Sequence, residues 1–191
     1  MELRRSMTVE EKRNIFLCGF MATGKSSVGK HLAALVSYDF LDMDAEIEAE
    51  EGISIPQIFA SRGEPAFRAL ESLMVERVAR KTRCVIATGG GTIVNPRNLE
   101  SLKRSGIVVT LTADIPTILL RVGAGDDRPM LRAGDRVERI RALLEQRAKA
   151  YARADITLDT SALSIDEVAR HIVARLQEQG FHLAPFSPGA S

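Results

Sequence analysis

The chain contains the run Gly19-Phe20-Met21-Ala22-Thr23-Gly24-Lys25-Ser26, which matches the pattern Gly-x-x-x-x-Gly-Lys-[Ser/Thr] in full. A short apolar run at 14–18 precedes it and predicts a strand, and an amphipathic pattern at 25–36 follows it and predicts a helix. In that context the glycines let backbone N–H groups of the loop point at a phosphate. The positive end of the helix that follows points at the same phosphate. We therefore predict a P-loop, the phosphate-binding turn of an α/β nucleotide-binding fold.

The rest of the chain repeats this alternation of short apolar runs and longer helical patterns. Further strands are predicted at 38–41, 84–87, 107–111 and 156–158, and further helices at 45–51, 64–81, 115–122, 137–152 and 164–179. The alternation predicts a three-layer α/β sandwich of the P-loop NTPase type, with a five-stranded parallel sheet and helices on both faces. Ligands of such folds bind where strands end, which places the expected site just after residues 18, 41, 87 and 111.

The composition is that of one ordinary globular domain. Hydrophobic residues make up 45% of the 191 residues and charged residues 27%, which is enough apolar material for one layered core. The formal net charge of +1 provides no field that would draw the chain onto nucleic acid or a membrane surface. We expect residues 1–191 to form a single P-loop domain with flexible ends at 1–13 and 181–191.

Two further features bear on the compartment. Residues 1–13 are charged and lack a signal-peptide pattern, and no apolar run is long enough to span a membrane. Cys18 and Cys84 each lie in a strand-like run, where we expect buried, reduced thiols. These features predict a cytoplasmic protein.

The residues of the P-loop have separate roles in nucleotide binding. The loop encloses the phosphates with its backbone, and the predicted ATP-binding residues are Gly19, Met21, Ala22, Thr23, Gly24, Lys25, Ser26 and Ser27. Lys25 can reach the β- and γ-phosphates and is a predicted catalytic residue. The Ser26 hydroxyl is a predicted ligand of Mg²⁺. ATP and Mg²⁺ are therefore the expected cofactors.

Two carboxylates, Asp42 and Asp44, follow the second predicted strand. At positions i and i+2 of an extended segment their side chains would point the same way. Beside a P-loop, one carboxylate could hold Mg²⁺ through water and the other a substrate hydroxyl. The alternative is an acidic cluster that stabilises the N-terminus of the helix at 45–51, and these residues alone leave both interpretations open.

Two more motifs are candidates for the substrate site. Gly89-Gly90-Gly91 follows the third strand, where three glycines let a ligand approach the backbone closely. A structural turn is the alternative, and the position at the strand's carboxyl end favours a binding loop. Arg68 lies on the helix at 64–81 among apolar neighbours, so the sequence leaves open whether it faces a site or solvent.

The segment at 122–136 is polar, basic and rich in glycine and proline. It contains Arg128, Arg132 and Arg136 and lies between two predicted helices. A loop of this length in a compact domain is typically functional. We interpret it as a lid that closes over the substrates and brings an arginine to the phosphates; the alternative is a solvated surface loop.

Taken together, these motifs resemble the shikimate kinase family over residues 15–177. The motifs of that family occur here in the same order, at 19–26, Asp42/Asp44, Phe67-Arg68, 89–91, Arg128-Pro129 and Arg147…Tyr151. The resemblance implies transfer of the γ-phosphate of ATP to the 3-hydroxyl of shikimate, in chorismate and aromatic amino-acid biosynthesis. It implies shikimate as the partner, and we expect a monomer that binds neither nucleic acid nor membrane.

The resemblance also assigns the residues of the acceptor site. It implies that Asp44 holds ring hydroxyls of shikimate and takes the proton of the attacking one, as a catalytic residue. It implies that Arg68 and Arg147 bind the carboxylate, for which planar guanidinium groups are well suited. Backbone groups of Gly89, Gly90 and Gly91 are implied to line the pocket.

On the nucleotide side, the resemblance implies that Asp42 helps to place Mg²⁺ and that Arg121 lies against adenine. It implies that Arg128 moves in from the lid to bind the phosphates, as a catalytic residue. The chain departs from many family members at 159–164, which has no basic residue to reach the base. Ala22-Thr23 also replaces the commoner Gly-Ala, with little expected effect because the loop acts through its backbone.

Two other functions fit parts of the pattern. Another small-molecule P-loop kinase, such as a gluconate or nucleoside monophosphate kinase, would share the fold, but Asp42/Asp44 paired with residues 89–91 disfavours it. A non-catalytic, shikimate-kinase-like ligand-binding module is the second alternative. The presence of Lys25, Asp44 and the lid arginines disfavours loss of activity.

Overall fold

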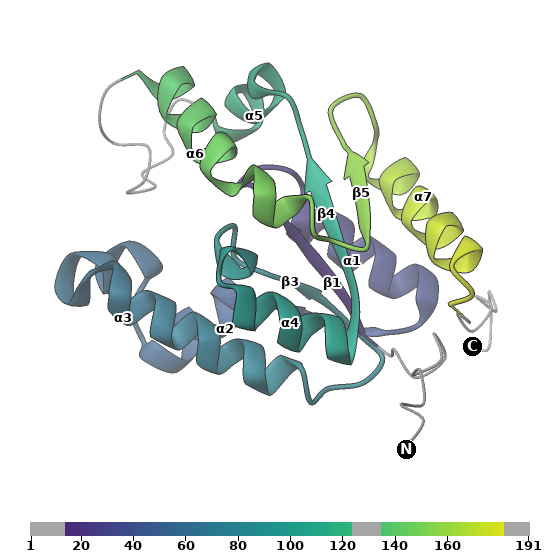
Figure 1. Ribbon diagram of the computed structural model, residues 1–191, viewed down its shortest axis with the longest axis horizontal. Helices are drawn as coiled ribbons and strands as arrows, with labels where there is room; N and C mark the ends of the chain where they lie inside the picture. The colour runs from purple at the N-terminus through teal and green to yellow at the C-terminus, as the bar shows by residue number, and fades with distance from the viewer. Residues whose placement is uncertain (1–13, 124–134, 182–191) are drawn as a thin grey trace, which may run out of the picture.

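A computed structural model describes residues 14–123 and 135–181 (Figure 1). In chain order its elements are β1 (Asn14–Gly19), α1 (Lys25–Val36), β2 (Asp39–Asp42), α2 (Met43–Glu51), α3 (Ile55–Val78), β3 (Cys84–Ala87), the 3₁₀ turn η2 (Thr92–Val94), α4 (Pro96–Ser105), β4 (Gly106–Thr112), α5 (Ile115–Val122), α6 (Arg136–Tyr151), β5 (Ile156–Asp159) and α7 (Ile165–Glu178). The predicted α/β class is confirmed. The region at 124–134, most of the predicted lid, lies outside the described residues.

All five strands form one parallel sheet in the order β2-β3-β1-β4-β5. β1 lies at its centre, with Ile15 opposite Val85 of β3 and opposite Ile107 of β4. Every residue of β1 is buried. A continuous apolar run is what a parallel strand covered on both faces requires.

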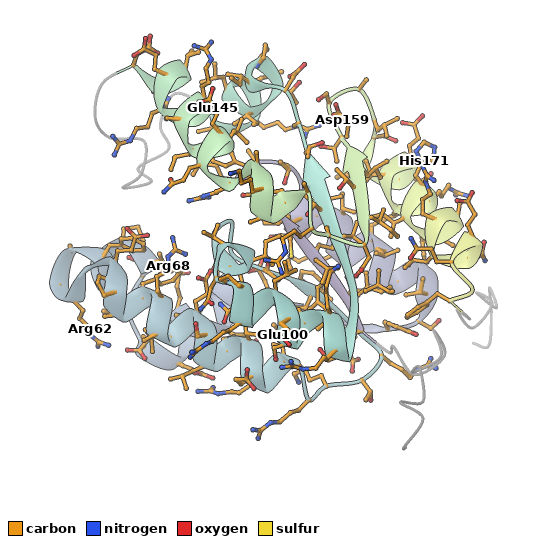
Figure 2. The ribbon with its side chains drawn as sticks, viewed as in Figure 1. Arg62, Arg68, Glu100, Glu145, Asp159 and His171 are labelled. Carbon is orange, nitrogen blue, oxygen red and sulfur yellow. The ribbon has the colours of Figure 1, made fainter. Side chains whose placement is uncertain are left out.

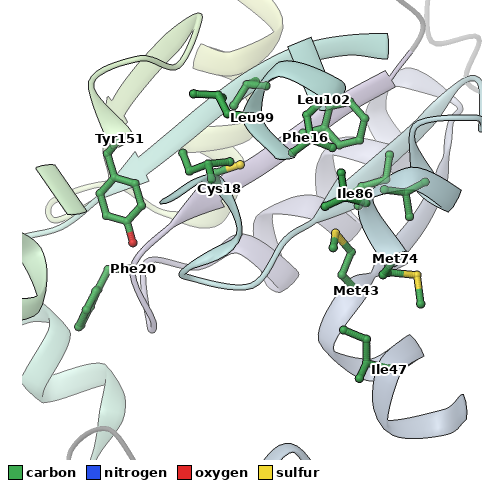
Figure 3. Packing of buried hydrophobic residues seen from close by; sticks show 14 of the residues in the cluster. Phe16, Cys18, Phe20, Met43, Ile47, Met74, Ile86, Leu99, Leu102 and Tyr151 are labelled. Atoms are coloured by element: carbon green, nitrogen blue, oxygen red, sulfur yellow. The ribbon is translucent and has the colours of Figure 1, made fainter. Parts of the chain in front are cut away.

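Helices cover both faces of the sheet, as predicted (Figure 1). Ile15 and Leu17 point to the face covered by α1 and α7. Phe16 and Cys18 point to the opposite face, where the buried cluster in Figure 3 packs against α2, α3, α4, α5 and α6. The two-residue period of a strand thus separates the core into two layers. Cys18 and Cys84 are buried and unpaired, as expected.

Helix α3 begins well before the predicted start at residue 64. Ser54 and Gln57 form a capping box, and Pro56 lies in the first turn, so a helix starts at Ile55. Gly63 then adopts a non-helical conformation with φ of 79°, and a second helical segment continues to Val78. The prediction found the second segment and missed the first, because the apolar period breaks at the kink.

Helix α4 is the other element that the prediction missed. Asn95 caps it through a hydrogen bond from the Arg97 N–H, and Pro96 occupies the first turn. The remaining predicted elements are confirmed within one or two residues at their ends. The predicted capping box of the last helix is present, with Ser164 and Glu167 bonded reciprocally. Within the described part of the chain, no helix is both long and apolar enough to cross a bilayer.

Candidate active site

A cavity of about 610 Å³ lies at the carboxyl ends of β1, β2 and β3. This is the edge of the sheet at which the strand order predicted a ligand site. Residues from five segments line it, among them Lys25, Ser26, Asp42, Asp44, Arg68, Glu71, Gly89, Gly90, Gly91 and Arg147. The tertiary structure thus places the P-loop, both aspartates, the glycine loop and two arginines around one space.

The P-loop begins where β1 ends, and its first residue has no room for a side chain. A Cβ on Gly19 would lie 2.1 Å from the Leu111 carbonyl oxygen of the neighbouring strand. Ala22 adopts a left-handed conformation with φ of 60°, in which an alanine costs about 1–2 kcal/mol. Ala22 therefore strains the loop in a way that a glycine would not.

Lys25, the first residue of α1, points back over the loop. Its Nζ donates to the Phe20 carbonyl oxygen at 2.8 Å. Thr23 is fully buried, and its hydroxyl donates to the same carbonyl at 2.8 Å. The Lys25 ammonium therefore lies inside the P-loop. The N-terminus of α1, which begins at Lys25, adjoins the same loop.

Ser26 and Asp42 meet at the edge of the cavity. The Ser26 hydroxyl donates to Asp42 Oδ2 at 2.5 Å, while Asp42 Oδ1 accepts from the backbone N–H groups of Asp44 and Ala45. Asp42 is thus the N-cap of α2 and a partner of the P-loop at once. Two adjacent hard oxygen ligands fit Mg²⁺, which takes few protein ligands and completes its shell with phosphates and water. Among the described side chains, no three or more His, Cys, Asp or Glu residues come together in a group that could hold a metal ion.

The predicted geometry of the two aspartates is wrong in one respect. Asp42 ends β2, but Asp44 lies in the first turn of α2, which begins at Met43 rather than at residue 45. The Asp42 cap starts the helix earlier than the apolar pattern indicated. The side chains therefore do not share one face of an extended segment, yet both line the cavity.

Asp44 has the most unusual environment in the cavity. Its Oδ1 is buried and has no hydrogen-bond partner among the described residues. The atom lies 3.0 Å from where a Cβ on Gly89 would be, so the glycine leaves room for it. Burial raises the pKa of Asp44 to about 6; the Lys25 ammonium opposes this, and the Asp42 carboxylate adds to it. A buried acceptor without a donor is suited to a hydroxyl supplied by a ligand.

Arg68 extends from α3 (Figure 2) and lines the cavity, where two carboxylates hold it. Its Nη1 donates to Glu71 Oε2 at 2.9 Å, and its Nε and Nη2 donate to Glu64 Oε1 at 3.1 and 2.9 Å. A Cβ on Gly91 would lie 2.5 Å from Arg68 Nη1, so a side chain there would push the guanidinium away from its present position against this loop. The structure thus places Arg68 at the site rather than in solvent.

Glu71 is a functional candidate that the sequence prediction missed. Its side chain is only 2% exposed, and its Oε1 accepts from the Thr92 hydroxyl at 2.6 Å while Oε2 binds Arg68. A buried carboxylate with two donors fixes the guanidinium in one orientation. Its spacing signalled burial only, because Glu71 occupies a core position between Phe67 and Met74 on the apolar face of α3; its partners are known from the structure alone.

Arg147 reaches the cavity from α6, on the side opposite Arg68. It is buried, and its Nη1 donates to the Gly90 carbonyl oxygen at 3.1 Å. Its guanidinium carbon lies 5.6 Å from the centre of the Phe20 ring, within cation–π range. Each residue of the glycine loop thus lies close to one charged group of the cavity: Gly89 to Asp44, Gly90 to Arg147 and Gly91 to Arg68.

A second cavity, of about 350 Å³, adjoins the outer side of the P-loop. Aliphatic side chains line most of it, together with Arg121. Arg121 Nη1 donates to the Thr160 hydroxyl at 3.0 Å and Nη2 to the Thr160 carbonyl at 2.7 Å. These bonds hold the guanidinium beside a cavity that P-loop residues also line. Arg128, the predicted lid arginine, lies outside the described residues.

Comparison with known proteins gives one consistent result. The family model described as shikimate kinase matches residues 21–177. The shikimate kinase of Geobacter metallireducens is 44% identical over 165 residues, which cover 86% of this chain and 92% of that protein. Among solved structures, shikimate kinase from Acinetobacter baumannii in complex with shikimate has a TM-score of 0.86 and 36% identity, covering 91% of this chain and 97% of that one. A gluconokinase from Sinorhizobium meliloti, with 19% identity and a TM-score of 0.56, shares the fold alone.

Proposed function

This chain belongs to the shikimate kinase family, and on that premise we propose how its residues bind the two substrates and transfer the phosphate. The chain has shikimate kinase activity: it is an ATP-dependent phosphotransferase of aromatic amino-acid biosynthesis. The observation that supports our residue assignment is the single cavity shared by the P-loop, the orphaned Asp44 carboxylate and two arginines. A phosphate-binding loop, a proton acceptor and two anchors for a carboxylate thus line one cavity.

The activity is tested by the choice of acceptor. ADP release is measured with shikimate, with gluconate and with a nucleoside monophosphate at equal concentrations. We expect turnover with shikimate alone, because two guanidinium groups and one carboxylate match an acid that carries ring hydroxyls. Equal turnover with gluconate would point to the gluconate kinase alternative, and binding of shikimate without turnover to a non-catalytic module.

For the acceptor, we assign the carboxylate of shikimate to Arg68 and Arg147, and a ring hydroxyl to Asp44. Arg68 is already oriented by Glu71 and Glu64, and Arg147 by Gly90 and Phe20. Preoriented guanidinium groups hold the acid with little loss of side-chain freedom. The orphaned Asp44 Oδ1 then accepts a hydrogen bond from the hydroxyl and takes its proton as the oxygen attacks.

For the nucleotide, we assign the β- and γ-phosphates to the P-loop backbone and Lys25. Ser26 and Asp42 are the side chains that would hold Mg²⁺, which neutralises phosphate charge when bound. Arg121 and the aliphatic walls of the second cavity would receive the adenine ring. Because Arg121 is fixed by Thr160, this arrangement does not need a basic residue at 159–164.

The magnesium assignment gives a prediction for Asp42→Asn. Asparagine caps helices as well as aspartate does, so α2 should persist, but the variant loses the charge beside Ser26. We expect the Mg²⁺ concentration for half-maximal rate to rise about 10–100-fold. Titration of the rate with Mg²⁺ at saturating substrates measures this, with Asp39→Asn at the exposed start of β2 as control. An unchanged magnesium requirement would remove Asp42 from the metal site.

The carboxylate assignment gives a prediction for Arg68→Lys. Lysine keeps the charge but loses the planar fork, and with it the bonds to Glu71 and Glu64. We expect the KM for shikimate to rise roughly 10–100-fold while the KM for ATP stays nearly constant, since a charged hydrogen bond contributes about 1.5–3 kcal/mol. Arg62→Lys, on the first segment of α3, is the matched control. A rise in the KM for ATP alone would place Arg68 elsewhere.

Three earlier expectations stay predictions. Arg128 is still expected to act on the phosphates, and Arg128→Ala would show this as a loss of kcat with shikimate binding retained. The chain is still expected to be a monomer, which light scattering of the purified protein measures. A cytoplasmic location is likewise still expected, and fractionation of cells tests it.

A further inference from the structure

Tyr151, the last residue of α6, places one polar atom in an otherwise apolar cluster. The residue is 6% exposed and its ring packs among the buried side chains of Figure 3, at the same end of that cluster as Phe20. Burial raises the pKa of its hydroxyl to about 12, so the group is a neutral donor. The hydroxyl donates to the Gly90 carbonyl oxygen at 2.6 Å.

Gly90 is the point at which several parts of the site touch. Its carbonyl accepts from Tyr151 and from Arg147 Nη1, so both of its lone pairs are used. The position that a Cβ on Gly90 would take lies 3.2 Å from Arg147 Nη1 and 3.4 Å from the Gly19 carbonyl oxygen. Gly90 is therefore packed closely against both Arg147 and the P-loop.

The next residue of the loop, Gly91, contacts the other guanidinium. Gly90 and Gly91 share one trans peptide, in which the C=O and the N–H point in opposite directions. Fixing the Gly90 carbonyl toward Tyr151 thus fixes the Gly91 N–H in the opposite direction and holds the Gly91 Cα against Arg68. Arg147 contacts Gly90 and Arg68 contacts Gly91, so the loop acts as a spacer that sets the distance between the two guanidinium groups.

We propose that Tyr151 is a positioning residue for the acceptor: its hydroxyl fixes the Gly90 carbonyl and thereby the spacing of the two guanidinium groups that receive the substrate carboxylate. The inference rests on the proposed function of Arg68 and Arg147. Tyr151 does not line the cavity, so it would affect the affinity for shikimate without touching shikimate itself. The cavity assigned to adenine is lined neither by this glycine loop nor by Tyr151.

The test is Tyr151→Phe, which removes the hydroxyl and keeps the ring that packs in the core. Tyr38→Phe is the matched control, since Tyr38 is the other tyrosine of the chain, lies against Arg83 and lines neither cavity. Steady-state kinetics give kcat and both KM values, calorimetry gives the Kd of shikimate for the free enzyme, and thermal unfolding gives Tm. The Tyr151→Phe change is repeated in an Arg147→Ala background, where the spacer has lost one of its two guanidinium groups.

We expect Tyr151→Phe to raise the Kd and KM for shikimate about three- to tenfold, the range of one net hydrogen bond, with kcat and the KM for ATP nearly unchanged. The effect should shrink in the Arg147→Ala background, because Arg147 shares the Gly90 carbonyl with the Tyr151 hydroxyl and also interacts with that hydroxyl directly. A lower Tm with unchanged shikimate affinity would show a purely structural hydroxyl and overturn the proposal, as would equal rises in both KM values. Absence of turnover in the unmutated enzyme would instead indicate failure of the proposed function, and the calorimetric Kd would still decide the role of Tyr151.

Discussion

Asp44→Asn is expected to lower kcat roughly 10²–10⁴-fold, the range that positioned general bases contribute. Asparagine has almost the same shape as aspartate but cannot take the proton of the attacking hydroxyl. Asp44 Oδ1 is buried, and none of the described residues donates a hydrogen bond to it. The measurement is single-turnover phosphorylation of shikimate under saturating ATP, which isolates the chemical step from product release.

Two further measurements separate catalysis from folding in this variant. A neutral amide is less costly to bury than an unpaired carboxylate, so we expect the Tm of the ligand-free Asp44→Asn variant to equal or exceed that of the unmutated chain. Asp39→Asn, at the exposed start of strand β2, which precedes α2, should change neither quantity. A loss of kcat below about tenfold would remove Asp44 from proton transfer and leave it with a binding role only.

Lys25→Ala is expected to lower kcat roughly 10²–10³-fold or more, as removal of one preorganised donor does in other enzymes. The Lys25 ammonium donates to the Phe20 carbonyl oxygen inside the loop, from where it can turn to the phosphates. Negative charge develops on the transferring phosphate in the transition state. Loss of the Lys25 ammonium should therefore lower kcat and not only raise the KM for ATP. Coupled measurement of ADP release over a range of ATP concentrations gives both values.

The fold should survive this change. Lys25 begins α1 and is only half-buried, and alanine is a favourable helix residue, so the Tm should fall by no more than a few degrees. Lys30→Ala is the matched control, because Lys30 is an exposed lysine of the same helix whose Nζ lies over the Phe40 ring. Turnover of Lys25→Ala within a few-fold of the unmutated rate would contradict the P-loop role of this lysine.

Much of the fold followed from local patterns. The helix at α1, the strand at β3 and the helix at α5 have the predicted bounds, because each has a complete apolar period and a clear start. The first segment of α3 and helix α4 were missed. Their starting signals, Ser54 with Gln57 and Asn95 with Pro96, are capping residues rather than apolar repeats. Capping chemistry would have found both.

The site was predicted less completely than the fold. The P-loop and the glycine loop could be read from spacing, since a phosphate cradle and a close backbone approach need glycine at fixed positions. Glu71 could not, because its importance comes from Arg68 on the same helix and Thr92 on another segment. Arg121 was assigned to adenine from the resemblance alone, and its bonds to Thr160, 39 residues away in the chain, could not be foreseen.

By itself the sequence determined that this chain has a parallel α/β fold, a phosphate-binding loop and polar groups at the ends of neighbouring strands. These properties are local, because they depend on apolar period, turn chemistry and residue spacing. Only the tertiary structure decided that Asp44 Oδ1 is buried without a donor and that Gly90 accepts from both Arg147 and Tyr151. Those facts depend on how α2, α6 and the loop after β3 pack together. Burial and hydrogen-bond pairing are set by contacts between distant segments, which no local pattern encodes.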